Sequence, residues 1–145
     1  MKATLTTGLL LVFVILAGCE TAPEQEGTAR SFDEAFYDFA WKRRPMVLFA
    51  PAKDDPRLVE QIDIMQKEKK GFGDRDLTLI EAIGEDARVI FPNEEKLRSG
   101  AGADLRGRFG VEPTEFAVVV VGKDGNMRYQ WSKPVDAETL FRAIE

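Results

Sequence analysis

The chain has 145 residues and a formal net charge of −5, and 44% of its residues are hydrophobic. Net acidity argues against nucleic acid as a partner, because phosphates favour basic surfaces. The sequence contains no histidine and a single cysteine. It therefore lacks the commonest general base, the commonest zinc ligand and the two thiols of a dithiol redox couple.

The first predicted element is an apolar leader that ends at the cysteine. Lys2 precedes an apolar run from Leu9 to Leu16, and Ala17-Gly18-Cys19 follows it directly. A charged start, an apolar core and small residues before a cleavage point are typical of a secretory signal. A transmembrane helix is the weaker alternative, because the run is well short of the roughly 20 residues that span a bilayer.

The sequence Leu16-Ala17-Gly18-Cys19 resembles the lipobox of bacterial lipoproteins. The resemblance implies a signal peptide at residues 1–18, diacylation of Cys19, and attachment to a membrane through lipid. It also implies a location in the cell envelope, facing the periplasm in a host with two membranes. Glu20 is not the aspartate that typically signals inner-membrane retention in such lipoproteins, which favours the outer membrane.

A polar tether is predicted between the leader and the folded domain. Residues 19–30 are polar and lack periodicity, which is typical of a flexible linker. The folded domain is expected to occupy residues 31–145. Its first helix is predicted over residues 33–42, because Ser31 and Glu34 form a capping-box pattern and phenylalanines follow at helical spacing.

A strand, a helix and a second strand follow. Residues 46–50 are all apolar, which is typical of a strand buried on both faces. Asp55 is expected to cap the next helix, with Pro56 at its first position, and apolar residues at helical spacing extend that helix over residues 56–70. The second strand is predicted over residues 77–83.

Residues 84–102 are the hardest to assign. Residues 89–91 are a candidate strand fragment, Asn93 is a candidate cap for one helical turn with Glu94 and Glu95, and the glycines near residue 101 indicate a loop. Further on, the pattern predicts a short helix over residues 104–109, a β-hairpin with strands at 116–121 and 127–131, and a final helix capped by Asp136.

These elements predict a single α/β domain whose four-stranded mixed sheet is flanked by helices. With the strands numbered along the chain, the expected sheet order is 2-1-3-4. The first two strands should be parallel and joined by a right-handed crossover. The last two should be antiparallel, because a tight turn joins them.

The element order and two motifs resemble the thioredoxin-like fold. Phe49-Ala50-Pro51 leads from the first core strand into a helix, where thioredoxins place their active-site turn. The run from Arg108 to Thr114 resembles the thioredoxin segment that carries a cis-proline. The resemblance therefore implies a cis peptide bond before Pro113.

Over residues 36–145 the sequence is similar to a bacterial thioredoxin-like family known as domain of unknown function 4174. The resemblance implies a fold and no substrate, because that family has no assigned activity. The Cys-x-x-Cys motif of active thioredoxins is missing here, since the corresponding stretch reads Pro51-Ala52-Lys53-Asp54-Asp55-Pro56. The shared motifs are Arg44-Pro45, Phe49-Ala50-Pro51, Asp54-Asp55-Pro56-Arg57, Arg108 to Val111, and Gly122 to Gly125.

The candidate binding residues are Lys53, Asp54, Asp55, Arg57 and Pro113. A helix N-terminus attracts anions, and Lys53 and Arg57 would add positive charge to it. The alternative is that Asp55 simply caps the helix. Metal binding is not expected, because the adjacent carboxylates lack calcium-loop spacing. No other cofactor is expected.

Two functional hypotheses follow. The first is a redox-inactive binding or accessory module, anchored through Cys19, that holds an envelope protein or peptide beside Pro113. The alternative is a small-ligand-binding domain or a non-thiol enzyme that uses the turn from Lys53 to Arg57. A binding module predicts an open apolar strip beside Pro113, whereas an enzyme predicts an enclosed pocket holding Asp54, Asp55 or Lys53 with a shifted pKa.

Overall fold

A computed structural model of the protein describes residues 29–145. Cys19, the predicted leader and most of the predicted tether lie outside the described residues. The helices are α1 (Phe32–Phe39), α2 (Pro56–Lys67), α3 (Lys69–Gly73), α4 (Ala101–Phe109) and α5 (Ala137–Ile144). The strands are β1 (Arg44–Ala50), β2 (Leu77–Ile83), β3 (Asp86–Phe91), β4 (Glu95–Lys96), β5 (Ala117–Val121) and β6 (Met127–Trp131).

All six strands belong to one mixed sheet with the order β4-β3-β2-β1-β5-β6. β1 and β2 are parallel, with Ala50 opposite Ile83, and the other neighbouring strands are antiparallel. The predicted order 2-1-3-4 corresponds to β2-β1-β5-β6 and is confirmed. The prediction of four strands is wrong, because β3 returns along β2 after a tight turn at Gly84, and β4 pairs with β3.

The two additional strands lie in the segment that the sequence assigned least well. The expected strand fragment at residues 89–91 is part of β3. The helical turn expected after Asn93 is wrong, because the chain there pairs with β3 and the Leu97 N–H donates to the Ala87 oxygen over 3.0 Å. A single helical turn is costly to nucleate, so pairing with an existing strand edge is favoured over it.

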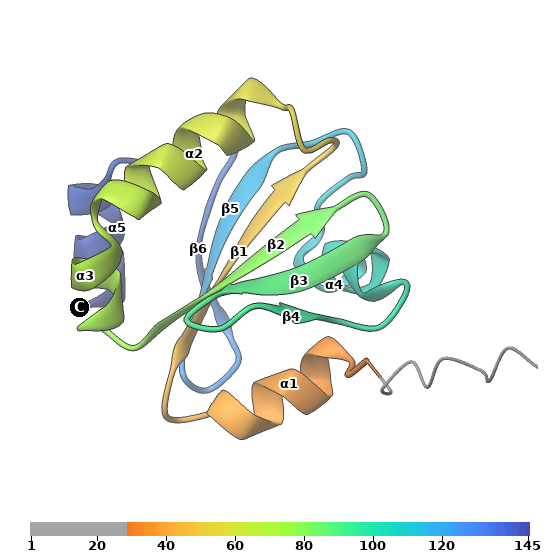
Figure 1. The fold of residues 1–145 in the computed structure, drawn as a ribbon, viewed down its shortest axis with the longest axis horizontal. Coiled ribbons are helices and arrows are strands. Elements are labelled where there is room, and N and C mark those ends of the chain that lie inside the picture. Colours follow the sequence, from red (N-terminus) through yellow and green to blue (C-terminus); the bar gives the residue numbers. More distant parts are fainter. Residues whose placement is uncertain (1–28) are drawn as a thin grey trace, which may run out of the picture.

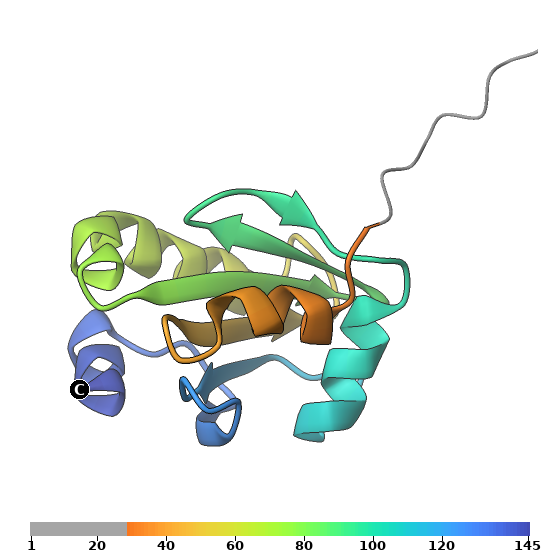
Figure 2. The same ribbon diagram turned by 90° about the horizontal axis from the view of Figure 1, so that it is seen from below.

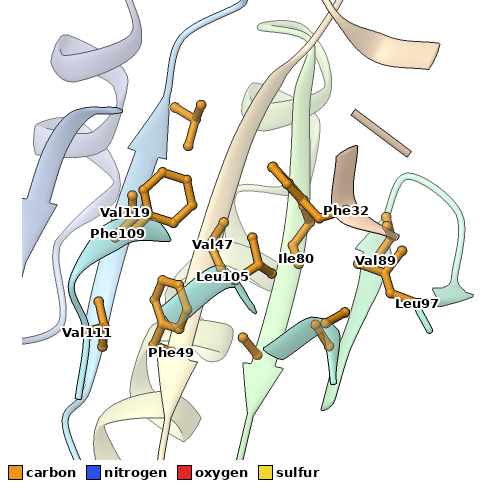
Figure 3. Packing of buried hydrophobic residues seen from close by; sticks show 14 of the residues in the cluster. Phe32, Val47, Phe49, Ile80, Val89, Leu97, Leu105, Phe109, Val111 and Val119 are labelled. Atoms are coloured by element: carbon orange, nitrogen blue, oxygen red, sulfur yellow. The ribbon is translucent and has the colours of Figure 1, made fainter. Parts of the chain in front are cut away.

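Helices cover both faces of the sheet, with α2 above it and α1 beneath it in Figure 1. The view from below in Figure 2 shows α1 crossing the sheet on the near side. β1 alternates between two cores: Met46 and Leu48 pack with α2 and α5, whereas Val47 and Phe49 pack with α1 and α4 (Figure 3). Residues 46–50 have no exposed surface, which confirms a strand buried on both faces.

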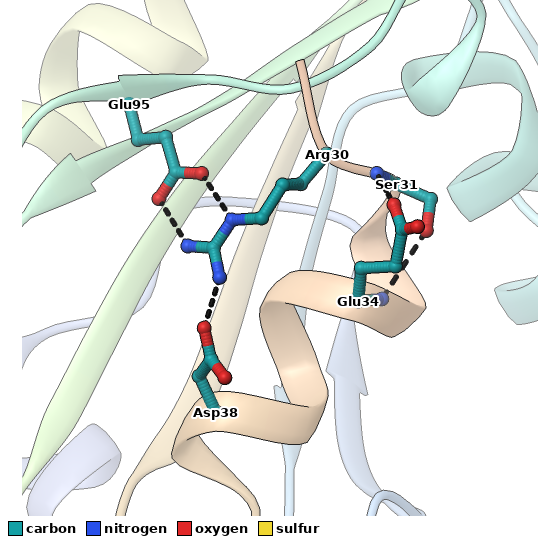
Figure 4. A network of polar contacts seen from close by, with 5 residues as sticks. All are labelled: Arg30, Ser31, Glu34, Asp38 and Glu95. Atoms are coloured by element: carbon teal, nitrogen blue, oxygen red, sulfur yellow. Dashed lines mark hydrogen bonds and ion pairs between the residues drawn. The ribbon is translucent and has the colours of Figure 1, made fainter. Parts of the chain in front are cut away.

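Two polar arrangements hold α1 and the segment that precedes it (Figure 4). The predicted capping box is confirmed, since Ser31 accepts from the Glu34 N–H and the Ser31 N–H donates to the Glu34 carboxylate over 2.7 Å. Arg30 donates from Nε and Nη2 to the two Glu95 oxygens, over 2.8 and 2.7 Å, and also pairs with Asp38. These contacts join the start of the described chain to α1 and β4.

Three helices differ in extent from their predictions. α1 ends at Phe39 instead of residue 42, because Ala40 is extended and the Trp41 N–H donates to the Lys123 oxygen over 2.9 Å. The helix predicted over 56–70 is divided at Glu68, whose φ of −110° and ψ of 20° interrupt it. α4 starts three residues before the prediction, at Ala101.

The final helix is capped by Asp136, as predicted. Within residues 29–145, the helices are all too short or too polar to traverse a lipid bilayer.

Candidate functional site

The turn between β1 and α2 is organised by one carboxylate. Asp55 accepts from the Arg57 N–H over 3.0 Å, and from Arg57 Nε and Nη2 over 2.9 and 2.7 Å. The bonds from the Arg57 side chain lower the pKa of Asp55 from 3.8 to about 2. Asp55 therefore stays ionised near neutral pH and caps α2, as the sequence predicts.

Arg57 and Lys53 connect this turn to different parts of the molecule. The Arg57 guanidinium carbon lies 5.4 Å from the centre of the Phe116 ring, just before β5. Lys53 lines a cavity beside β2 and β3. Asp54 is exposed. The turn is thus divided between a helix cap, a contact to β5 and the edge of a cavity.

Pro113 lies in a β-turn, and the prediction of a cis bond before it is wrong. The cis bond in the described residues precedes Pro92 instead. The Glu115 N–H donates to the Glu112 oxygen over 3.0 Å, and the Glu112 N–H donates to the Glu115 carboxylate over 2.9 Å. Proline with a trans bond suits the second position of such a turn, because its φ is already fixed near the required value.

Arg106 on α4 joins this turn to the sheet, a role that the sequence analysis missed. Nη2 donates to the Ala50 oxygen over 2.7 Å, Nη1 to the Glu112 oxygen over 2.8 Å, and Nε to the Gly84 oxygen over 3.3 Å. The residue is 5% exposed, and burial lowers its pKa. The available signal was its spacing, three residues before buried Phe109 on the inner face of a helix.

A groove runs along the α2 face of β2 and β3, where two cavities of about 290 and 650 Å³ share Glu81, Arg88 and Glu94. We call this surface the β2–β3 groove. Lys53 lies at the larger cavity, and Pro113 is not among the residues that line either one. The smaller cavity has mostly apolar walls, made of Ile62, Met65, Phe72, Leu77, Leu79, Ile90 and Phe91.

Glu81 is the polar centre of the β2–β3 groove. Its side chain is 6% exposed, and its Oε1 lies 3.5 Å from Nε of Arg88, whose side chain is 45% exposed. From the sequence alone, Glu81 is expected to be an ordinary residue of the second strand. The signal was present, however, because Glu81 is the single charged residue in β2, between apolar Ile80 and Ala82.

The structure brings together only part of the predicted site. Arg57 and Arg106 hold the β1–α2 turn close to the Glu112–Pro113 segment. The cavities, however, lie on the β2–β3 side of the turn. Within residues 29–145, carboxylates do not gather in groups of three or more that could hold a metal ion.

The sheet order, with helices on both faces, defines a thioredoxin-like α/β domain. Solved structures of this fold include the reduced 2-Cys peroxiredoxin of Plasmodium vivax, with a TM-score of 0.54, 15% identity, and coverage of 74% of this chain and 78% of that one. Thioredoxin peroxidase I of Plasmodium yoelii gives a TM-score of 0.55 at 15% identity, covering 74% of each chain. At this identity the similarity shows the fold alone.

The chain belongs to the family described as "Domain of unknown function (DUF4174)", whose model matches residues 35–145. Coiled-coil domain-containing protein 80 of Danio rerio is 23% identical over 125 residues, covering 77% of this chain and 14% of the relative. Sushi repeat-containing protein SRPX2 of Homo sapiens is 26% identical over 113 residues, covering 77% of this chain and 24% of the relative. The chain therefore spans less than a quarter of the length of these curated relatives.

Proposed function

We propose that this protein is a lipid-anchored, thiol-independent binding module of the cell envelope. The anchor is supported by the lipobox-like sequence that ends at Cys19. Thiol independence is supported by composition, because Cys19 is the single cysteine and an anchor would consume it. Thiol peroxidase and disulfide exchange reactions both require a free thiolate.

The observation that carries the binding role is the burial of Glu81 in a groove with apolar walls. Removing a carboxylate from water costs several kcal/mol unless partners compensate it. A strand residue with only a packing role would be apolar, as the adjacent Ile80 and Ala82 are. Concave, mostly apolar cavities with a few convergent polar groups are the usual sites of small ligands. We therefore assign ligand binding to the β2–β3 groove instead of the surface beside Pro113.

A non-thiol enzyme at the turn from Lys53 to Arg57 has less support. The Asp55 carboxylate is occupied by Arg57, and its pKa of about 2 is far from neutral. A general acid or base works best with a pKa near the operating pH. Asp55 is thus better suited to capping than to proton transfer.

The anchor is tested by comparing wild type, Cys19→Ser and Thr21→Ala in cells that are fed labelled palmitate. We expect label and a mature N-terminus at residue 19 in wild type and in Thr21→Ala, because both retain the cysteine. Cys19→Ser should carry no label. Equal labelling of Cys19→Ser would refute the anchor, whichever fraction contains the protein.

The binding role is tested by native mass spectrometry of the mature protein extracted from its own envelope. We expect wild type to carry a small adduct that is released on denaturation. The adduct should be reduced in Glu81→Gln and kept in Glu60→Gln, which changes an exposed carboxylate of α2 outside the groove. A wild-type spectrum without an adduct would contradict occupancy of the groove in the cell.

A further inference from the structure

We propose that the β2–β3 groove takes a small amphipathic cation, in which an ammonium or guanidinium group is attached to a hydrocarbon chain. Glu81 is its counter-ion, and the apolar walls take the chain. The inference rests on the proposed binding function and adds the sign of charge and the chemical class of the ligand.

The positive charge that we assign to the ligand follows from the unequal burial of Glu81 and Arg88. The Glu81 side chain is 6% exposed, whereas 45% of the Arg88 side chain remains exposed. Their closest contact is 3.5 Å, which is longer than the 2.7–2.9 Å of a charge-assisted hydrogen bond between nitrogen and carboxylate. Within the described residues, Glu81 forms its ion pair with Arg88. A ligand cation that donates directly to Glu81 supplies the missing bond, while Arg88 turns into water at little cost.

The apolar component follows from the walls beside Glu81. Ile62 and Met65 of α2 face Leu79 of β2 and Ile90 of β3 across the smaller cavity. The cavity that they help to line has a volume of about 290 Å³, near the lower end of the volumes typical of ligand sites. A short hydrocarbon chain is stabilised there, because burying its methylene groups removes apolar surface from water.

An anionic ligand is the specific competitor to this assignment. Lys69 lies 5.7 Å from the centre of the Phe91 ring on the wall of the smaller cavity, and Arg88 lines both cavities. An anion in the smaller cavity would contact these two side chains, but its charge would also meet buried Glu81 and the Glu94 carboxylate at the shared part of the groove. Glu81 is the more buried of these charged groups, so its repulsion of an anion makes a cation the favoured ligand.

The test uses three probes of equal length: hexylamine, hexanoate and hexanol. Each is titrated into the purified mature lipoprotein in non-ionic detergent, with isoleucine methyl groups observed by NMR. Ile62 and Ile90 report on the groove, whereas Ile80 and Ile144 lie outside it. We expect saturable shifts of the Ile62 and Ile90 methyl signals with hexylamine, weaker shifts with hexanol and none with hexanoate.

Three variants identify the counter-ion. Glu81→Gln should weaken hexylamine binding at least tenfold, and Glu94→Gln should weaken it less, because Glu94 is exposed. Glu60→Gln should leave binding unchanged. Unaltered dispersion of the Ile80 and Ile144 signals shows that each variant is folded. If Glu81→Gln does not fold, the comparison of hexylamine with hexanol and hexanoate in wild type still decides whether the groove prefers a cation.

Two results would overturn the inference in different ways. Hexanoate binding that Arg88→Gln abolishes would make the groove an anion site, which refutes the cation assignment and leaves the binding module intact. If none of the probes shifts Ile62 or Ile90, both the ligand class and the groove as a binding site are wrong.

Discussion

Glu81 and Arg88 are directly opposite each other on β2 and β3, but Glu81 is far more buried than Arg88. The Glu81 side chain is 6% exposed and the Arg88 side chain 45%, with 3.5 Å between Oε1 and Nε. The energetic consequences of changing the two residues should therefore differ. The carboxylate carries most of the desolvation penalty, and the guanidinium provides the charge that offsets it.

We predict that Arg88→Ala destabilises the protein more than Glu81→Leu does. Arg88→Ala leaves a buried carboxylate without its counter-charge and should lower the free energy of unfolding by about 1–2 kcal/mol. Glu81→Leu removes that buried charge and should change stability by less than about 1 kcal/mol, or raise it. Urea unfolding of both variants provides the measurement. The reverse order would mean that Glu81 contributes net stability to the fold.

Asp55 should make the stability of the protein depend on pH in the acid range. Its pKa is about 2 in the folded protein and 3.8 in the reference state, so the unfolded chain binds the proton more readily. The stability that the Asp55 charge adds is fully present above about pH 5, and it disappears as pH falls through 2. We expect the difference in urea midpoint between wild type and Asp55→Asn to be constant near pH 6, and to shrink between pH 4 and pH 2. Asp54→Asn is the matched control, because that neighbouring side chain is exposed.

Arg106 should not be replaceable by lysine. Its three nitrogen atoms each donate to a different backbone oxygen, and one ammonium group cannot reach all three positions. Arg106→Lys should lower the free energy of unfolding by about 2–3 kcal/mol and speed hydrogen exchange at the Glu115 N–H, because the Glu112 turn loses a support. Arg108→Lys, at an exposed ion pair with Asp33, should cost less than about 1 kcal/mol. Equal effects of the two substitutions would show that the contacts of Arg106 add little to stability.

Two glycines of α4 should respond in opposite directions to substitution by alanine. A Cβ at Gly102 would lie 2.5 Å from the Asp86 oxygen, so Gly102→Ala must push the helix away from the β2–β3 turn and should cost about 2 kcal/mol. A Cβ at Gly107 meets no atom within 4 Å, so Gly107→Ala should add about 0.5–1 kcal/mol through helix propensity. Thermal unfolding of the two variants shows whether each substitution raises or lowers the stability of the protein. Stabilisation by both substitutions would show that α4 is free to move from the sheet.

Elements with strong local signals could be predicted from the sequence. The capping residues Ser31, Asp55 and Asp136 each start a helix as expected, because a cap depends on contacts within one turn. β3 and β4 were harder, since β3 begins with an acidic residue and β4 has only two residues. A strand that short is defined by the partner that it pairs with, which a local pattern does not reveal.

The predicted site residues were partly separated by the tertiary structure. Asp55 and Arg57 interact across two positions in the chain, so their relationship could be predicted locally. Arg106 contacts the Ala50 oxygen 56 positions away, and Glu81 meets Arg88 only because β3 folds back on β2. Both residues are charged members of otherwise buried faces. That conflict between residue type and position is the signal that can be recognised without a structure.

The position of Arg106 changes where a ligand could enter this fold. In open α/β sheets, ligands usually occupy the crevice beyond the carboxyl ends of the parallel strands. The Ala50 oxygen at the end of β1 and the Gly84 oxygen just after β2 lie at that edge, and both accept from Arg106. The guanidinium of α4 thus occupies part of the crevice that a bound molecule would hold elsewhere. The larger cavity still reaches this edge of the sheet, because Lys53 and Ile83 are among the residues that line it, so a ligand in the β2–β3 groove would meet the edge beside Arg106.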